Sequence, residues 1–109
     1  MHSDMEVFFA IHAVQDFYEN LPRAELVRTE RLIVLLRCYG NRLRLPHSRA
    51  LGDGLFELRL NGKHAVRLIY CYLNGGAYLL HGLVKKTGTL LSRDIEQARR
   101  IRAALIADS

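Results

Sequence analysis

The chain has 109 residues, of which half are hydrophobic, and it carries a formal net charge of +5 with a sequence pI of about 9.6. This length predicts one compact domain over residues 1–109 and excludes two, and the hydrophobic content suffices for a core without disulfide bonds. The basic excess favours a polyanionic partner, most often nucleic acid, and the longest apolar run, at residues 32–36, is too short to cross a membrane.

The cysteines and histidines give no sign of a metal site. Cys38 and Cys71 lie far apart in the sequence, and the five histidines show no ligand spacing with a cysteine or a carboxylate. We therefore expect no metal and no other cofactor. The polar start of the chain, residues 1–4, does not resemble a signal peptide, so a cytoplasmic protein with reduced thiols is expected.

The N-terminal half predicts one strand and two helices. Residues 5–11 are rich in β-branched and aromatic side chains, as in a strand, and residues 12–21 carry apolar side chains at helical spacing. Pro22 suits the first turn of a second helix, which is expected to run to Tyr39 and to stop at the following glycine. Residues 41–54 are punctuated by proline and glycine and are interpreted as a connector.

The C-terminal half predicts three strands followed by a helix. The apolar period is two from Leu55 onward, and strands are expected at residues 55–60, 64–73 and 77–85. Ser92 is a suitable N-cap for the last helix, which presents an apolar stripe. The predicted fold is therefore α+β, in the order β-α-α-β-β-β-α. It comprises an antiparallel β-meander plus an N-terminal strand, a two-helix hairpin on one sheet face and a C-terminal helix.

The lengths of the two meander turns fix the predicted strand register. A two-residue first turn would place Phe56 opposite Arg67, so that core would face charge. Three-residue turns at residues 61–63 and 74–76 remove this conflict. The expected pairs are then Leu58 with Val66, Phe56 with Leu68, Glu57 with Arg67, Tyr70 with Leu80, and Val66 with Val84.

This register divides the meander into an apolar face and a basic face. The apolar face, which the helical hairpin can cover, collects Phe56, Leu58, Val66, Leu68, Tyr70, Leu80 and Val84. The opposite face collects Glu57, Arg59, Arg67, His81 and Lys85. Arg59 and Lys85 are expected to flank the small Ala65 side chain, which leaves room for a phosphate. The alternative is a solvated face on which Glu57 and Arg67 form an ordinary cross-strand ion pair.

Several motifs on these strands resemble the phage-derived branch of the RelE/HigB toxins. Residues 51–59 are similar to its L-x-x-G-L-x-E-L-R stretch, residues 66–70 to its y-R-v-x-Y strand, and residues 80–87 to its L-h-g-F-x-K-K-t strand. Residues 95–99 resemble the e-I-x-x-A-x-x-r start of the last helix, and residues 21–22 and 36–40 match the helical hairpin in type and spacing. The order and spacing of these motifs cover nearly the whole chain.

The resemblance implies a fold, an activity and a partner. The implied fold is a sheet with two helices on one face and the terminal helix at an edge. The implied activity is cleavage of messenger RNA in the ribosomal decoding site, which inhibits translation. The implied partner is a small antitoxin, often a helix-turn-helix repressor encoded beside the toxin. The chain departs from the family in having no aromatic residue or histidine after Lys86, Val84 where an aromatic is common, and Thr89-Leu90 where a proline is usual.

The basic face carries the candidate catalytic residues. The guanidinium groups of Arg59 and Arg67 match phosphate oxygens bidentately, and Lys85 suits either a phosphate clamp or a proton-transfer group. His81 is a candidate general acid or base, or else a hydrogen-bonded histidine of the sheet. The candidate contacts to the RNA backbone or the ribosome, each also interpretable as a solvated charge, are Lys86, Arg49 and Arg44.

These observations lead to one function and two alternatives. The main hypothesis is a metal-independent, ribosome-dependent endoribonuclease, the toxin of a type II toxin–antitoxin pair, with messenger RNA, the ribosome and a cognate antitoxin as partners. The first alternative is a ParE-type toxin of the same fold that acts on DNA gyrase. The second is a non-catalytic member that only binds nucleic acid or its antitoxin, which the missing C-terminal aromatic residue leaves open.

Overall fold

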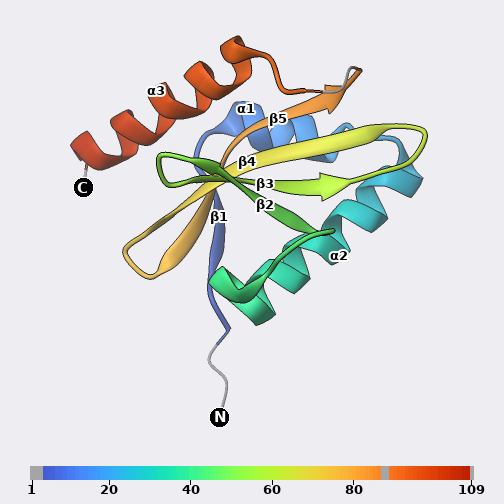
Figure 1. Cartoon of the computed structure of the whole chain (residues 1–109), viewed down its shortest axis with the longest axis horizontal. Helices are drawn as coiled ribbons and strands as arrows, with labels where there is room; N and C mark the ends of the chain where they lie inside the picture. Colours follow the sequence, from blue (N-terminus) through green and yellow to red (C-terminus); the bar gives the residue numbers. More distant parts are fainter. Residues whose placement is uncertain (1–3, 87–88, 109) are drawn as a thin grey trace.

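The computed structural model describes residues 4–86 and 89–108 and shows one five-stranded sheet with three α-helices (Figure 1). The elements are β1 (Val7–Phe9), α1 (His12–Glu19), α2 (Arg23–Tyr39), a 3₁₀ turn η1 (Gly40–Arg42), β2 (Ser48–Gly52), β3 (Leu55–Leu60), β4 (Ala65–Leu73), β5 (Gly76–Lys85) and α3 (Ser92–Asp108). The strand order is β1-β5-β4-β3-β2, with β1 parallel to β5 and the other pairs antiparallel. The start of the chain at residues 1–3, and Thr87 of the last strand motif, lie outside the described residues.

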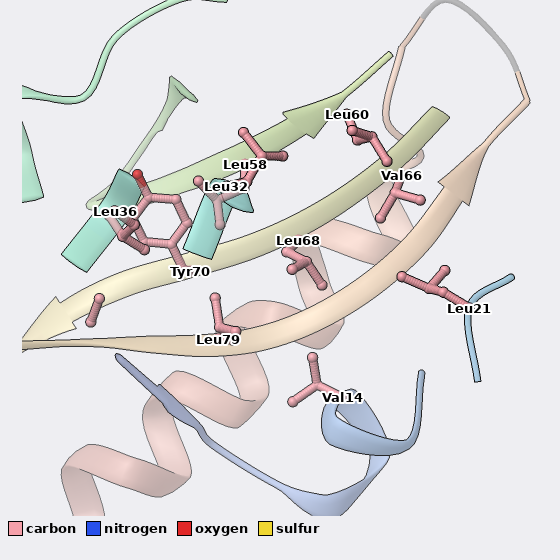
Figure 2. Close-up of a cluster of buried hydrophobic side chains, with 11 residues drawn as sticks. Val14, Leu21, Leu32, Leu36, Leu58, Leu60, Val66, Leu68, Tyr70 and Leu79 are labelled. Atoms are coloured by element: carbon pink, nitrogen blue, oxygen red, sulfur yellow. The ribbon is translucent and has the colours of Figure 1, made fainter. Parts of the chain in front are cut away.

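Helices cover both faces of the sheet and create two separate cores. On the first face, α1 and α2 bury Val14, Leu32 and Leu36 against the sheet, where they meet Leu68 and Tyr70 (Figure 2). On the second face, α3 contacts β4 and β5. Its core consists of Leu55, Ile69, Cys71, Leu80 and Ala98, with Ile95, Ile101 and Leu105 packed against it. The predicted α+β fold class is confirmed and is consistent with a RelE-like fold.

The position of α3 differs from the expected one at a sheet edge. The helix lies across the second face because its apolar stripe requires an apolar surface, and Ile69, Cys71 and Leu80 provide one. One part of the second face is therefore buried beneath α3, and the remaining part carries polar side chains. Only the part of this face that α3 leaves uncovered is open to a ligand.

Strand β2 was not expected, since it lies inside the predicted connector. It pairs with β3 through Ser48 opposite Leu58 and Ala50 opposite Phe56. Ser48 is almost fully buried, and its hydroxyl lies 2.7 Å from the hydroxyl of Tyr70 in a hydrogen bond. Pro46 precedes this short strand, Gly52 is its last residue and Gly54 follows it, so the residues that suggested a loop lie around and at the end of a strand. The sheet thus has five strands instead of the predicted four.

The first hairpin pairs two residues away from the predicted register. Leu58 lies opposite Leu68 instead of Val66, and Arg59 lies opposite Arg67. A shift of two residues leaves every side chain on its original face, so matching apolar to apolar positions cannot detect it. Lys85 lies opposite Ala65 as predicted, whereas Arg59 does not.

The second hairpin has a shorter turn than predicted and contains a bulge. Asn74 and Gly75 form a two-residue turn, and both have the positive φ angles, 53° and 80°, that such turns favour. Val66 opposite Val84 is confirmed. Beyond a register shift between Ile69 and Tyr70, however, Tyr70 pairs with Leu79 instead of Leu80. The bulge moves Leu80 from the predicted hairpin face to the core beneath α3.

The Gly82→Ala substitution should destabilise the fold, because Gly82 is in close contact with helix α1. A Cβ atom at residue 82 would lie 2.2 Å from Cδ2 of Phe17 and 2.9 Å from its Cγ. Overpacking of this kind typically costs about 1–3 kcal/mol. Urea denaturation should show the loss, and the double variant Gly82→Ala/Phe17→Leu, with a smaller residue at position 17, should recover part of it. Equal stability of Gly82→Ala and the wild type would show that this helix–strand contact is looser than described.

Candidate functional site

A buried carboxylate with several cationic neighbours lies on the part of the second sheet face that α3 leaves uncovered. Glu57 of β3 has no exposed surface. Its Oε1 lies 3.0 Å from Nη1 of Arg59 and 3.1 Å from Nε of Arg67, and its Oε2 lies 3.5 Å from Nη2 of Arg49. We call these four residues and Lys85 the Glu57 cluster. Four cationic side chains accompany one carboxylate, so three positive charges are left uncompensated.

Strand pairing explains why these residues meet. Arg49 of β2 lies opposite Glu57 of β3, and Arg59 lies opposite Arg67 of β4, so all four project from the same face. Glu57 and Arg67 are therefore diagonal neighbours on adjacent strands and not directly opposite residues. They still form the predicted cross-strand ion pair. The alternation of side chains along the strands correctly predicted that Glu57, Arg59 and Arg67 share a face. Arg49 joins them because the unexpected strand β2 pairs with β3.

Arg67 is buried, contrary to our expectation that it is accessible to solvent. Its side chain is 3% exposed. Its Nη1 donates to the carbonyl oxygens of Leu60 and Val66 at 3.0 Å each, and its Nη2 donates to Oδ1 of Asn61 at 3.0 Å. Burial, followed by the charge of Arg59, lowers the pKa of Arg67, and Glu57 acts in the opposite direction. The guanidinium group is occupied by protein partners, so Arg67 is suited to positioning Glu57 and the strand ends.

The accessible cations of the cluster are Arg49, Arg59 and Lys85. The Arg49 and Arg59 side chains are 48% and 17% exposed, respectively. Desolvation, followed by the charge of Arg67, lowers the pKa of Lys85, although Glu57 opposes this shift. Glu57 Oε2, Arg59 Nε and Arg67 Nε are buried and have no hydrogen-bond partner among the described residues. Because buried polar atoms are nearly always hydrogen-bonded, these three atoms distinguish the cluster from an ordinary ion-pair network.

A cavity lies beside Lys85, between the end of β5 and the start of α3. Its volume is about 340 Å³, and its lining includes Lys85, Lys86 and Arg93 together with Asp94. Lys86, expected as an RNA contact, thus lies next to the cluster. A cavity edged by several cations can accept a phosphate group or part of a nucleotide.

His81 and Arg44 are not part of the Glu57 cluster. His81 lies opposite Ile69, four residues before Lys85, which corresponds to about 13 Å along the strand. Its Nε2 lies 2.8 Å from Oδ1 of Asp94, and this hydrogen bond links β5 to the first turn of α3. Arg44 lies on the loop before β2 and hydrogen-bonds to the carbonyl oxygens of Asn41 and Leu43. The sequence did not indicate Asp94 as the partner of His81, because that contact joins two elements of the tertiary fold, whereas the contacts of Arg44 lie within its own loop.

Asn61 is a site residue that the sequence interpretation assigned only to a turn. Its side-chain oxygen accepts a hydrogen bond from Arg67, and its carbonyl accepts one from Arg28 of α2 at 2.9 Å. Among the described residues, no group of three histidine, cysteine or acidic side chains is arranged to hold a metal ion. Within the same residues, no helix has the length and apolar character needed to cross a bilayer.

The fold and this face define a small α+β protein with a candidate site for polyanions. Residues 16–103 match the model of a family described as phage derived protein Gp49-like (DUF891), and the chain belongs to this family. No curated protein gives a significant match to the chain.

Proposed function

We propose that this protein is the toxin of a type II toxin–antitoxin pair and a ribosome-dependent endoribonuclease. The observation that carries the proposal is the Glu57 cluster, where Arg49 and Arg59 contact a buried carboxylate and Lys85, from the same sheet face, is close enough to feel its charge. Membership of the Gp49-like family and a fold consistent with RelE-like toxins support it. The motif resemblance to RelE/HigB toxins, which comes from the same sequence as the family match, is in line with it.

RNA cleavage without a protein nucleophile places three demands on such a site. The 2′-OH must attack the adjacent phosphate in line, a proton must leave that hydroxyl, and another must reach the departing oxygen. Arg49 and Arg59 suit the stabilisation of the extra negative charge on the phosphate, because preorganised cations need no reorganisation during the reaction. Lys85 suits proton transfer, since its lowered pKa increases the fraction of the neutral amine at neutral pH. Glu57 and Arg67 act as positioning residues.

Dependence on the ribosome follows from what the cluster lacks. No histidine makes a printed contact with the described part of the cluster, and His81, about 13 Å along β5 from Lys85, is hydrogen-bonded to Asp94 instead. One amine with a lowered pKa is a modest catalyst for a flexible RNA. We therefore propose that the ribosome holds messenger RNA in the geometry for in-line attack. The proposed partners are thus messenger RNA, the ribosome and a cognate antitoxin, for which a small helix-turn-helix protein is expected.

Induced expression should test this proposal against gyrase poisoning. We expect growth to stop when the soluble protein accumulates and to recover when the neighbouring antitoxin gene is co-expressed. In extracts, translation should fall while DNA supercoiling continues, because the cationic cluster suits RNA phosphates. Loss of supercoiling with normal translation would favour a ParE-type toxin. Normal growth with verified soluble protein would count against any toxin.

A further inference from the structure

A second basic pocket lies at the edge of the molecule between α2 and the end of β3. Its volume is about 390 Å³, within the range of roughly 300–1,000 Å³ that is usual for small-molecule sites. Its lining includes the cations Arg28, Arg31 and Arg59 together with His47, and Leu35 and Pro46 are its accessible apolar residues. We call it the edge pocket.

The charges in the edge pocket are not balanced within the part of the chain that the structure describes. None of the lining residues is acidic. Glu25, three residues before Arg28 on α2, instead faces His64, with Oε2 3.5 Å from Nδ1. Among the described residues, no hydrogen bond or ion pair holds the side chain of Arg31. An exposed pocket with arginine side chains and an apolar wall can bind a phosphate through its charges and a base through apolar contact.

The edge pocket is connected to the Glu57 cluster through two residues. Arg59 lines the pocket and also lies 3.0 Å from Glu57. Asn61 accepts a hydrogen bond from Arg28 on the pocket side and another from the buried Arg67 on the cluster side. This hydrogen bond orders the Arg28 side chain before a ligand binds. Less side-chain entropy is therefore lost on binding.

We propose that the edge pocket binds a nucleotide of the single-stranded RNA that the Glu57 cluster acts on, at a position neighbouring the reacting phosphate. Arg28 and Arg31 bind the phosphate, and Leu35 and Pro46 contact the base. The proposal rests on the proposed function, because it takes the same RNA as the ligand of both sites. It adds a second contact that holds the strand across the edge of the sheet.

Binding of an RNA that cannot be cleaved tests this proposal separately from catalysis. The probes are a fluorescein-labelled 2′-O-methyl dodecanucleotide and the matching trinucleotide. Arg31→Ala should weaken dodecanucleotide binding by about ten- to a hundredfold and reduce the salt slope by about one, since one charge-assisted phosphate contact is lost. Trinucleotide binding should change little. Arg37→Ala, on the same helix but outside the edge pocket, is the matched control.

The outcomes separate this inference from the proposed function. Equal dodecanucleotide affinities for Arg31→Ala and Arg37→Ala overturn the inference, as does a wild type that binds both probes equally. If Arg31→Ala instead weakens only the complex with the co-expressed antitoxin, the pocket takes a protein segment and the inference is wrong. RNA binding that depends on Arg31, without cleavage on ribosomes, leaves the inference standing and contradicts the proposed activity. Thermal melts of both variants confirm folding, which alanine in an exposed helix should preserve.

Discussion

Arg67→Ala should lower the free energy of unfolding by about 3–5 kcal/mol, because it removes a partner of a fully buried carboxylate. The substitution also leaves the Leu60 and Val66 carbonyls and Asn61 without the donors that they have in the structure. Urea denaturation measures the change directly. Arg49→Ala provides the matched control, since Arg49 contacts the same carboxylate but is half exposed, and its loss should cost about 1 kcal/mol or less.

A double variant tests whether the buried charge is the cause. Arg67→Ala/Glu57→Gln removes the unpaired charge as well as the arginine, so part of the lost stability should return. An Arg67→Ala protein as stable as Arg49→Ala would mean that Arg67 is solvated, contrary to its burial here. Because unfolded toxin is inactive for a trivial reason, the activity of Arg67 variants must be expressed per folded molecule.

Lys85→Ala should reduce the rate of RNA cleavage by about a hundred- to a thousandfold, the usual effect of losing one group that stabilises a transition state. Lys85 is only partly buried and no ion pair of the described structure holds it, so stability should change by about 0.5 kcal/mol or less. Arg100→Ala, an exposed cation on α3, is the control and should leave both quantities unchanged. Rates and thermal melts should be measured on the same preparations.

The pH dependence of the rate separates the two roles open to Lys85. Desolvation, followed by the charge of Arg67, lowers the pKa of the amine, so its neutral form becomes populated at lower pH than in a free lysine. If the neutral amine accepts the proton of the 2′-OH, the rate of the wild type rises with pH until that lowered pKa is passed. Lys85→Arg keeps the charge but removes this titration, so its profile should be flat. A Lys85→Arg variant as fast as the wild type would make Lys85 a phosphate clamp alone.

Side-chain alternation predicted the faces of the sheet but not the details of strand pairing. Leu58 and Leu68 were placed correctly in the core even though the register was two residues away, because a shift of two keeps each side chain on its face. The bulge that moves Leu80 to the other core leaves no mark in the sequence pattern. Strand β2 was hidden because its flanking proline and glycine residues are those of a connector.

The sequence predicted which residues form the candidate site but not how deeply they are buried. Arg59, Arg67 and Lys85 were expected on one face, and the structure groups them around Glu57. The burial of Arg67 could not be foreseen, because charged residues that alternate along a strand suggest a solvated face. Arg67 is covered because its guanidinium group is bonded to the strand ends and to Asn61, which are contacts of the tertiary fold.

The most direct test of the central claim is primer extension on a defined message, with purified wild-type protein, in the presence and absence of translating ribosomes. We expect new 5′ ends within the translated region only when ribosomes are present, and Lys85→Ala should produce about a hundredfold fewer of them. Efficient cutting of the naked message would contradict the dependence on the ribosome. The absence of new ends with active ribosomes and folded protein would contradict the endoribonuclease itself.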